Sequence, residues 1–552
     1  MLSIQAKQTL SMRTRDGVRL DADVYTPKGR GPFPVLLMRQ PYGRAIASTI
    51  VYAHPLWYAR QGYIVVIQDV RGRGTSEGQF DLFAHEVSDG EETVQWASQL
   101  PGSDGQVGMY GFSYQGMTQL QSAQAQPPAL KTIAPAMTGY HLYEDWATEN
   151  GAFCFQLGLM WAIQLAAETA RREGDNAAFS QLLQAARNLP VLDPKPAAPA
   201  ALAGVDSFFH DWVSRSSGDP YWQQLTPQLD QVDLPVLHIG GWFDPYLRGD
   251  LRCYREMASR AQALHHFWVG PWRHIPWGQK VGAVDFGPAA MSPIDQVHIR
   301  WFDAILKEKG KEELMAESPI KLFEMGTNQW RHLSAWPETP TQNTSGTTYF
   351  LQSTGTANIR TDSGRLSVVQ QTQPTTDALV HDPWNPAPAL GGHSAIPAGS
   401  FERTEIDQRG DVLTYTSNPM TQPLRVAGVA EVVCAIAAST PSYDLCAVLS
   451  RVKEGKAYNL TQGYRRVDAT QKTENVISLP LHPTCFSLAP GESIRLSLSA
   501  ACFPAYLVNP GTGASLQESR QVDAQIITLA IVIGGTAGAT LRLPQPPDTA
   551  HD

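Results

Sequence analysis

The chain is poor in cysteine and carries no excess of positive charge. Its 552 residues include six cysteines, and none of them shows the Cys-x-x-Cys spacing of a metal or redox site. A chain of this length can bury several cores without cross-links, so we expect free thiols rather than disulfides. Acidic residues outnumber lysine and arginine by 52 to 43, for a formal net charge of -9, which argues against a nucleic-acid partner.

Long apolar runs are also lacking. The first residues, MLSIQAK, do not join a charged stretch to an apolar one, so no signal peptide is predicted. The longest apolar candidate, 524–533, is too short and too interrupted for a membrane span and predicts a buried strand. We therefore expect a cytoplasmic enzyme that contacts neither nucleic acid nor membrane. The sequence is also compatible with a homo-oligomer.

The chain does contain a serine between glycines, directly after a strand-like segment. The stretch GMYGFSYQG (108–116) holds Gly111-x-Ser113-x-x-Gly116, a nucleophile-elbow pattern with one additional residue before the second glycine. A helix-compatible run, 117–123, follows it. Such a turn between strand and helix presents the serine hydroxyl away from the sheet, and the glycines let the two backbones pass closely. Because serine is a weak nucleophile, a base and an oxyanion site should lie nearby.

Apolar strands alternate with helices through the first 310 residues. The strand-like segments are 20–25, 35–39, 63–67, 130–135, 234–241 and 265–270, and helix-like segments lie near 57–60, 89–99 and 295–308. This alternation predicts an α/β fold with a doubly wound, mostly parallel sheet that is covered on both faces. We assign residues 1–139 and 229–310 to this domain.

Two other regions have a different pattern. Residues 140–228 carry alanine-rich helical stretches and no convincing strand, so they predict a helical cap inserted between two strands of the sheet. The charged segment 310–318 is predicted to be a linker. From 319 to 552, short alternating strands separated by Gly, Pro, Asn and Ser turns predict an all-β sandwich or jelly roll. The strands expected there include 320–323, 348–351, 412–415, 430–433 and 493–498.

Two residues that follow later strands can complete a serine triad. In doubly wound hydrolase sheets the chain order is Ser, then Asp or Glu, then His. Asp244 follows the strand 236–240 directly, and His274 lies in an irregular Pro- and Trp-rich loop after the next strand. An Asp-Pro turn would explain Asp244 alone. The order Ser113, Asp244, His274 favours a triad instead.

Other residues compete for these two roles. Asp250 is the second candidate for the acid, although it falls in a predicted helix. His265 and His266 begin a strand, so we expect them to be packed or exposed rather than catalytic.

An oxyanion site needs two hydrogen-bond donors. The backbone N–H of Tyr114, the residue after the serine, is one candidate. Tyr42, in the loop after an early strand, offers a phenol O–H as the second, although it could equally be a tyrosine packed at the sheet edge.

The glycine-rich loop 69–78 resembles a phosphate cradle only superficially. It lacks the Lys-Ser/Thr of a P-loop, and its Gly-x-Gly does not open a helix as a dinucleotide site requires. We expect Asp69 and Arg71 to form structural hydrogen bonds that fix the loops under the active site. Neither a cofactor nor a metal is predicted.

Aromatic residues are concentrated near the start of the predicted cap. At helical spacing such residues usually form a core, but a cap that lies over Ser113 would direct some of them into a substrate pocket. Trp146, Trp161 and Tyr246, the last of which lies just beyond Asp244, are the candidates for substrate binding.

Four ordered motifs carry a resemblance to a known family. They are QDVRGRGxSEG (68–78), GxSYxG (111–116), GWFD (241–244) and GPWxH (270–274), and RWFD (300–303) and GxNxWR (326–331) accompany them. Through these motifs almost the whole chain resembles the cocaine esterase-like hydrolases of the X-prolyl dipeptidyl-peptidase family. The resemblance implies an α/β-hydrolase domain, a helical cap and a C-terminal jelly roll.

The resemblance also implies site roles. Ser113 would be the nucleophile, His274 the base and Asp244 its partner, with Tyr42 as an oxyanion donor. Trp146 and Trp161 lie close to where the similar esterases carry acyl-pocket aromatics. The similar α-amino acid ester hydrolases place acidic residues near the triad to hold a substrate ammonium.

This chain departs from that pattern beyond Asp244, where it has Tyr246 and Leu247 instead. An apolar or aromatic acyl group is therefore expected. The N-terminal helical domain of the longer dipeptidyl-peptidases has no counterpart here, which weakens a dipeptidase interpretation.

The sequence thus predicts a serine hydrolase that cleaves carboxylic esters in a small-molecule substrate through an acyl-enzyme. An acylase or aminopeptidase that uses the same triad on an amide or peptide bond is the alternative. A carbohydrate-binding protein with an inert hydrolase domain is a second alternative, which an intact triad disfavours.

Overall fold

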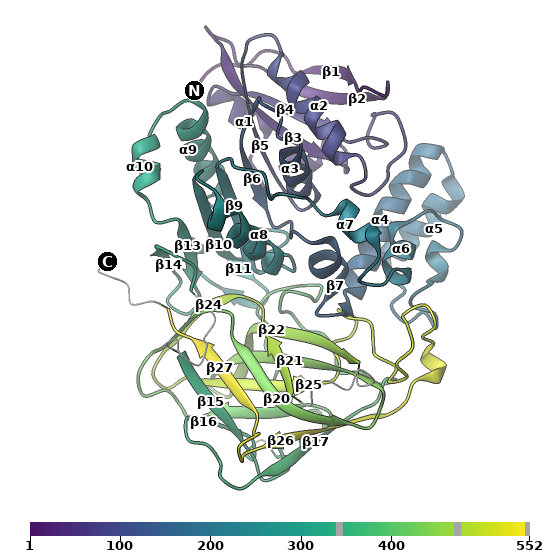
Figure 1. The fold of residues 1–552 in the computed structure, drawn as a ribbon, viewed down its shortest axis with the longest axis vertical. Coiled ribbons are helices and arrows are strands. Elements are labelled where there is room, and N and C mark those ends of the chain that lie inside the picture. Colours follow the sequence, from purple (N-terminus) through teal and green to yellow (C-terminus); the bar gives the residue numbers. More distant parts are fainter. Residues whose placement is uncertain (338–345, 361, 469–475, 547–552) are drawn as a thin grey trace.

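The computed structural model describes residues 1–337, 346–360, 362–468 and 476–546. An α/β part with its helices lies at the top of Figure 1, the helices α4 to α7 lie at its side, and a strand-rich part lies below. The predicted combination of an α/β domain and a β-rich domain is confirmed.

A single sheet of ten strands organises the α/β part, in the order β1-β2-β4-β3-β5-β6-β9-β10-β13-β14. The bounds are β1 Gln8–Arg13, β2 Arg19–Tyr25, β3 Phe33–Gln40, β4 Ile64–Asp69, β5 Ser103–Phe112, β6 Leu130–Ala136, β9 Val236–Phe243, β10 His265–Arg273, β13 Ile320–Glu324 and β14 Gln329–Leu333. From β4 to β13 neighbouring strands pair in parallel, and antiparallel strands close both edges.

Helices cover both faces of this sheet, which explains why its strands read as continuous apolar runs. Helices α2 Glu86–Ser98, α3 Tyr114–Gln124 and α8 Leu247–Arg260 pack on one face together with Leu37 of β3. Helices α1 Pro55–Arg60 and α9 Ile294–Leu306 pack on the other face together with Leu36 and Met38. Alternate residues of one strand thus enter two different cores.

The region between β6 and β9 forms the cap over the sheet. Its helices are α4 Phe155–Glu173, α5 Asn176–Arg187, α6 Phe208–Ser214 and α7 Pro220–Leu225. The cap also contains a hairpin of two short strands, β7 Thr148–Glu149 and β8 Ala152–Phe153, where no strand was predicted. Strands of two residues are too short to show an alternating pattern in a sequence.

The β domain comprises the strands from β15 onward. An eleven-stranded sheet contains β15 Gly346–Gln352, β16 Arg365–Ser367, β17 Thr375–His381, β18 Leu413–Ser417, β20 Glu431–Ala438, β21 Ser442–Lys453, β22 Lys456–Asp468, β23 Val476–Pro480, β25 Ser493–Ser499, β26 Ile527–Ile533 and β27 Thr540–Pro544. Strands β19 Leu424–Gly428 and β24 Thr484–Leu488 form a separate pair. In β26 buried residues alternate with partly buried ones, as the prediction of a buried strand at 524–533 requires.

Two expectations for the junction of the domains are wrong. The segment 320–323, predicted to belong to the β domain, forms β13 and pairs in parallel with β10 in the first sheet. The segment 310–318, predicted to be a linker, contains the short helix α10 Lys311–Ala316. A short apolar strand fits the edge of either sheet, so its own sequence does not decide which sheet it joins.

Candidate active site

Ser113 forms the turn between β5 and α3 by itself. Its backbone adopts φ 59° and ψ −128°, a region that costs a non-glycine residue on the order of 1–3 kcal/mol. Neighbouring groups hold it there, because its N–H donates to the carbonyl of Ala136 at 2.9 Å and its carbonyl accepts from the hydroxyl of Thr138 at 2.6 Å. The predicted nucleophile elbow is thus present, with the serine 7% exposed.

The two glycines of the motif are required by close approaches. A Cβ on Gly111 would lie 2.5 Å from the Cβ of Gln115, and a Cβ on Gly116 would lie 2.6 Å from the Cβ of Thr138. Neither distance is tolerable for carbon atoms. The strand and the helix can therefore meet this tightly only with glycine at both positions.

Asp244 and His274 meet at the carboxyl edge of the sheet. They follow the neighbouring parallel strands β9 and β10, and Nδ1 of His274 lies 2.5 Å from Oδ2 of Asp244. The other carboxylate oxygen accepts the N–H of Tyr246 at 2.9 Å. Asp244 is fully buried, so water does not compete for its oxygens. This hydrogen bond places the hydrogen on Nδ1 and leaves Nε2 of His274 as the basic nitrogen.

The imidazole of His274 is held between aromatic rings. The ring of Phe112, which precedes Ser113, lies 5.4 Å from it, and the ring of Tyr246 lies 5.3 Å from it. The indole N–H of Trp277 donates to the carbonyl of His274 at 3.0 Å. With its side chain 24% exposed, the imidazole is fixed in place and still accessible from solvent.

The competing candidates have other contacts. Asp250 lies on α8, where its Oδ1 accepts the N–H groups of Thr138 and Gly139 at 3.0 and 2.9 Å, and it is buried among carboxylates so that its pKa lies well above the ordinary value. Asp250 therefore fixes the loop in which the Thr138 hydroxyl donates to the Ser113 carbonyl. His265 and His266 are buried on β10, as expected for packing histidines.

Tyr42 turns its hydroxyl toward the serine. The indole N–H of Trp161 donates to the Tyr42 oxygen at 3.2 Å, and the hydroxyl also faces the side chain of Ser113. Burial raises the pKa of Tyr42 to about 12 despite these contacts, so the phenol stays protonated at neutral pH. Because Trp161 occupies an oxygen lone pair, the hydroxyl hydrogen is free to point toward an oxyanion.

Tyr114 is fixed by its side chain, which leaves its backbone N–H for the site. As the first residue of α3, its N–H has no partner within the helix. Its phenol donates to Glu86 at 2.9 Å, and its ring stacks on Phe83 with a centroid distance of 4.5 Å.

Glu86 belongs to a buried ion pair that the sequence analysis missed. Its carboxylate accepts from Arg39 of β3 at 2.6 Å, and Arg39 also donates to Gln68 at 2.9 Å. Arg39 ends the continuous apolar run 35–39, and this position could have predicted the ion pair. A charge at the end of a buried strand is removed from water and therefore requires a partner.

The three predicted substrate-binding aromatics come together over the elbow. The Trp146 ring lies 5.2 Å from Trp161 and 4.4 Å from Tyr246. Two further aromatics join them that were not predicted: Phe83 at 5.3 Å from Trp146, and Phe208 at 4.8 Å from Trp161. We refer to these five residues as the aromatic cluster.

The glycine-rich loop has the structural role expected for it. The carboxylate of Asp69 accepts the backbone N–H of Arg44 at 2.7 Å and pairs with the Arg44 guanidinium. Arg71 forms bidentate contacts with Asp89 and with Asp16. These pairs fasten the loop to the sheet and to α2.

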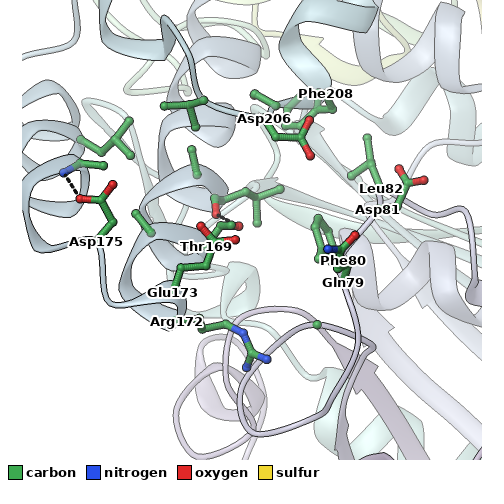
Figure 2. A pocket seen from close by; sticks show the side chains of 18 of the residues that line it. Gln79, Phe80, Asp81, Leu82, Thr169, Arg172, Glu173, Asp175, Asp206 and Phe208 are labelled. Carbon is green, nitrogen blue, oxygen red and sulfur yellow. Dashed lines mark hydrogen bonds between the residues drawn. The ribbon is translucent and has the colours of Figure 1, made fainter. Parts of the chain in front are cut away.

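A cavity of about 610 Å³ lies between the glycine-rich loop and the cap. Figure 2 shows Phe80 and Leu82 on the loop side and Thr169 on the side of helix α4, with several carboxylates around the opening. Phe208 lines this cavity and also belongs to the aromatic cluster. The carboxylates are those of Asp81, Glu173, Asp175, Asp206 and Asp211.

The described ranges lack a metal-ligand cluster, a disulfide and a membrane-spanning helix. There, no group of three or more His, Cys, Asp or Glu side chains is placed to hold a metal ion. All six cysteines are free thiols. Among the described helices, none is both long and apolar enough to cross a membrane.

Comparison with known proteins identifies the relatives of this chain. The X-Pro dipeptidyl-peptidase (S15 family) profile matches residues 16–276, and the X-Pro dipeptidyl-peptidase C-terminal non-catalytic domain profile matches residues 313–536. A cocaine esterase from a Rhodococcus species is 31% identical, covering 90% of this chain and 91% of the relative.

Two solved structures share the fold over the whole length. An aminopeptidase from a marine sediment Thaumarchaeota archaeon has a TM-score of 0.80 at 21% identity, covering 97% of this chain and 96% of its own. An α-amino acid ester hydrolase has a TM-score of 0.78 at 22% identity, covering 98% and 96%. The chain therefore belongs to the X-Pro dipeptidyl-peptidase (S15) family of serine hydrolases.

Proposed function

We propose that the chain hydrolyses carboxylic esters through an acyl-enzyme formed on Ser113. The observation that carries this proposal is the buried hydrogen bond between Asp244 and His274, at the sheet edge where the elbow holds Ser113. The similarity to a cocaine esterase supports the ester as the substrate class.

In the first half-reaction the Ser113 oxygen attacks the carbonyl carbon while its proton passes to Nε2 of His274. Asp244 stabilises the resulting imidazolium. The tetrahedral intermediate then expels the alcohol, which takes the proton from His274, and the acyl group stays on the serine. In the second half-reaction water attacks the acyl carbon with the same base, and Ser113 leaves as the hydroxyl.

The oxyanion of each intermediate would accept hydrogen bonds from the Tyr42 phenol and the Tyr114 N–H. Both groups are held before the substrate arrives, the first by Trp161 and the second by the contacts of the Tyr114 side chain with Glu86. Donors held in place in this way need no reorganisation when charge develops.

The walls of the site favour an uncharged acyl group. The aromatic cluster offers apolar ring faces and edges next to Ser113, which suits an apolar or aromatic acyl chain. The neighbouring cavity is acidic on balance, because its five carboxylates outnumber its two arginines, Arg73 and Arg172. Burial and then the nearby Asp206 and Asp211 raise the pKa of Asp81. Substrates that carry a carboxylate should therefore be poor ones.

An amidase or aminopeptidase is the second candidate, because the family profile is named for a peptidase and one structural neighbour is an aminopeptidase. The same triad can cleave both an ester bond and an amide bond. Rates on a matched aryl ester and anilide with the same acyl group separate the two activities, and we expect the ester to be cleaved faster.

The test of the proposal is Ser113→Ala, with Ser122→Ala as the matched control. Ser122 is also buried on α3, but its hydroxyl donates to the carbonyl of Thr118 within that helix. We expect Ser113→Ala to abolish ester hydrolysis and labelling by a fluorophosphonate probe, while Ser122→Ala keeps both. Hydrolysis retained by a folded Ser113→Ala protein would contradict the proposal.

A further inference from the structure

Arg73 is a buried arginine without a carboxylate partner. It lies in the glycine-rich loop 69–78 and is 1% exposed. Its neighbour Arg71 pairs with Asp89 and Asp16, whereas no acidic side chain of the described ranges forms an ion pair with Arg73. Burial lowers the pKa of Arg73 to about 10, so the guanidinium is still charged at neutral pH. Because an unpaired buried charge is costly, the contacts that Arg73 does make call for a reason.

The guanidinium of Arg73 reaches from the loop to helix α4 of the cap. Its Nη1 donates to the carbonyl of Leu165 and to the hydroxyl of Thr169, each at 3.2 Å. Its central carbon lies 3.8 Å from the centroid of the Phe80 ring, a cation–π contact. Figure 2 shows Phe80 and Thr169 on the two sides of the cavity between the loop and the cap. Arg73 therefore joins the loop to one particular turn of α4.

This turn of α4 lies next to Trp161. Leu165 follows Trp161 by four residues, so the two are neighbours on one face of the helix. The indole N–H of Trp161 donates to the Tyr42 oxygen at 3.2 Å. Tyr42 follows β3 and does not belong to the cap, so any shift of α4 relative to the sheet would change this distance. By fixing α4, Arg73 fixes one partner of the hydrogen bond between Trp161 and Tyr42.

The same loop also holds the other partner of this hydrogen bond. The carboxylate of Asp69 accepts from Nε2 of Gln40 at 3.2 Å and from the N–H of Arg44 at 2.7 Å. These residues lie two positions before and two positions after Tyr42. Oε1 of Gln40 in turn accepts the N–H of Tyr42 at 3.0 Å. The loop 69–78 thus holds the backbone around Tyr42 at one end and α4 at the other.

We propose that Arg73 is a positioning residue for the oxyanion site, which holds α4 so that the Trp161 indole stays on the Tyr42 oxygen and the Tyr42 hydrogen points toward the oxyanion. The proposal rests on the proposed function, because it takes Tyr42 as an oxyanion donor. Arg73 has almost no surface that a substrate could touch, so it acts through Tyr42. Small displacements of such groups have large effects: a shift of about 1 Å can cost about 100-fold in rate.

The experiment compares Arg73→Met with Arg403→Met on an aryl ester. Methionine keeps an apolar stem and removes every N–H of the guanidinium. Arg403 is the matched control, because it is also a buried arginine, but it pairs with Asp407 in the β domain. We expect Arg73→Met to lower kcat about 10- to 100-fold with little change in KM, whereas Arg403→Met keeps the parent kcat per folded molecule.

A double-mutant cycle with Tyr42→Phe separates positioning from a general loss of packing. Since Arg73 acts through the Tyr42 hydroxyl, Arg73→Met should lower kcat by less than about threefold in the Tyr42→Phe background. The inhibition constant of an aryl trifluoromethyl ketone, which forms an oxyanion on Ser113, should rise in Arg73→Met by the factor by which kcat falls. An equal loss of kcat in both backgrounds would overturn the proposal.

A milder variant covers the case in which Arg73→Met does not fold. Thr169→Val removes one acceptor of Arg73 from α4 with a side chain of the same shape, and it should lower kcat about threefold, only while the Tyr42 hydroxyl is present. A kcat equal to that of the parent in folded Thr169→Val, or within twofold of it in folded Arg73→Met, would contradict the proposal. Activity retained by Ser113→Ala would instead overturn the proposed function, so the two failures are distinguishable.

Discussion

Replacing Tyr42 with phenylalanine removes one oxygen atom and tests how the site stabilises an oxyanion. The partly buried ring keeps its packing against the core, and only the hydroxyl is lost, with its contacts to Trp161 and Ser113. Because burial raises the pKa of Tyr42 to about 12, the parent hydroxyl is a neutral donor throughout the working pH range. The substitution therefore removes a donor without changing the charge.

The effects on catalysis and on stability should differ in size. Loss of one oxyanion donor lowers kcat about 100- to 1,000-fold, which corresponds to about 2.7–4 kcal/mol. Loss of the part-buried hydrogen bond from Trp161 should lower the free energy of unfolding by only about 1 kcal/mol, as for a typical intramolecular hydrogen bond. The rate should thus fall far more than stability does, because Tyr114 alone would remain as a donor.

The assay is kcat for an aryl ester, measured beside the melting temperature. Tyr52→Phe is the control, since Tyr52 is a buried tyrosine whose hydroxyl has no hydrogen-bond partner within the described structure. Trp161→Phe should give an intermediate loss in the parent and a smaller loss in the Tyr42→Phe background, because its indole acts through the Tyr42 hydroxyl. A folded Tyr42→Phe protein with kcat within threefold of the parent would refute the assignment of Tyr42.

Three further predictions concern the base, the acyl pocket and acid stability. Asp244→Asn should lower kcat by about 10,000-fold in a folded protein, since the amide cannot hold His274 in the required tautomer; circular dichroism checks the fold. Phe208→Ala removes a wall between the cavity and Trp161, so kcat/KM for a bulky acyl ester relative to an acetyl ester should rise about tenfold. Burial lowers the pKa of His266 from its ordinary value to about 4. Because His266 takes up a proton at higher pH in the unfolded state than in the folded state, the free energy of unfolding falls as the pH drops from about 6.5 to about 4. In denaturant titrations across that range His266→Gln should reduce the fall by about 3 kcal/mol, and an unchanged fall would contradict the assignment to His266.

Local chemistry made much of the α/β part predictable. The strand, turn and helix around Ser113 could be predicted because glycine spacing and apolar runs are properties of neighbouring residues. The positions of Asp244 and His274 after two neighbouring strands predict that both lie on the same edge of the sheet, since parallel strands present their carboxyl ends together.

Contacts between distant segments could not be predicted in this way. Strand order favours Asp244 over Asp250 as the partner of His274, but only the fold gives the reason, which is that Asp250 binds the loop after β6. The segment 320–323 has the composition of either sheet, and only its pairing with β10 decided between them.

The amino-acid order alone thus determined the elbow, the sequence of candidate catalytic residues and the α/β and β-rich domains, because these follow from short-range backbone preferences and from periodicity. Tertiary structure decided which side chains meet around them. Glu86 reaches Arg39 only where α2 packs on the sheet, and Phe208 reaches Trp161 only where α6 packs beside α4 in the cap. Burial then gives each of these contacts its strength, since a polar group removed from water depends on the partner that the fold supplies.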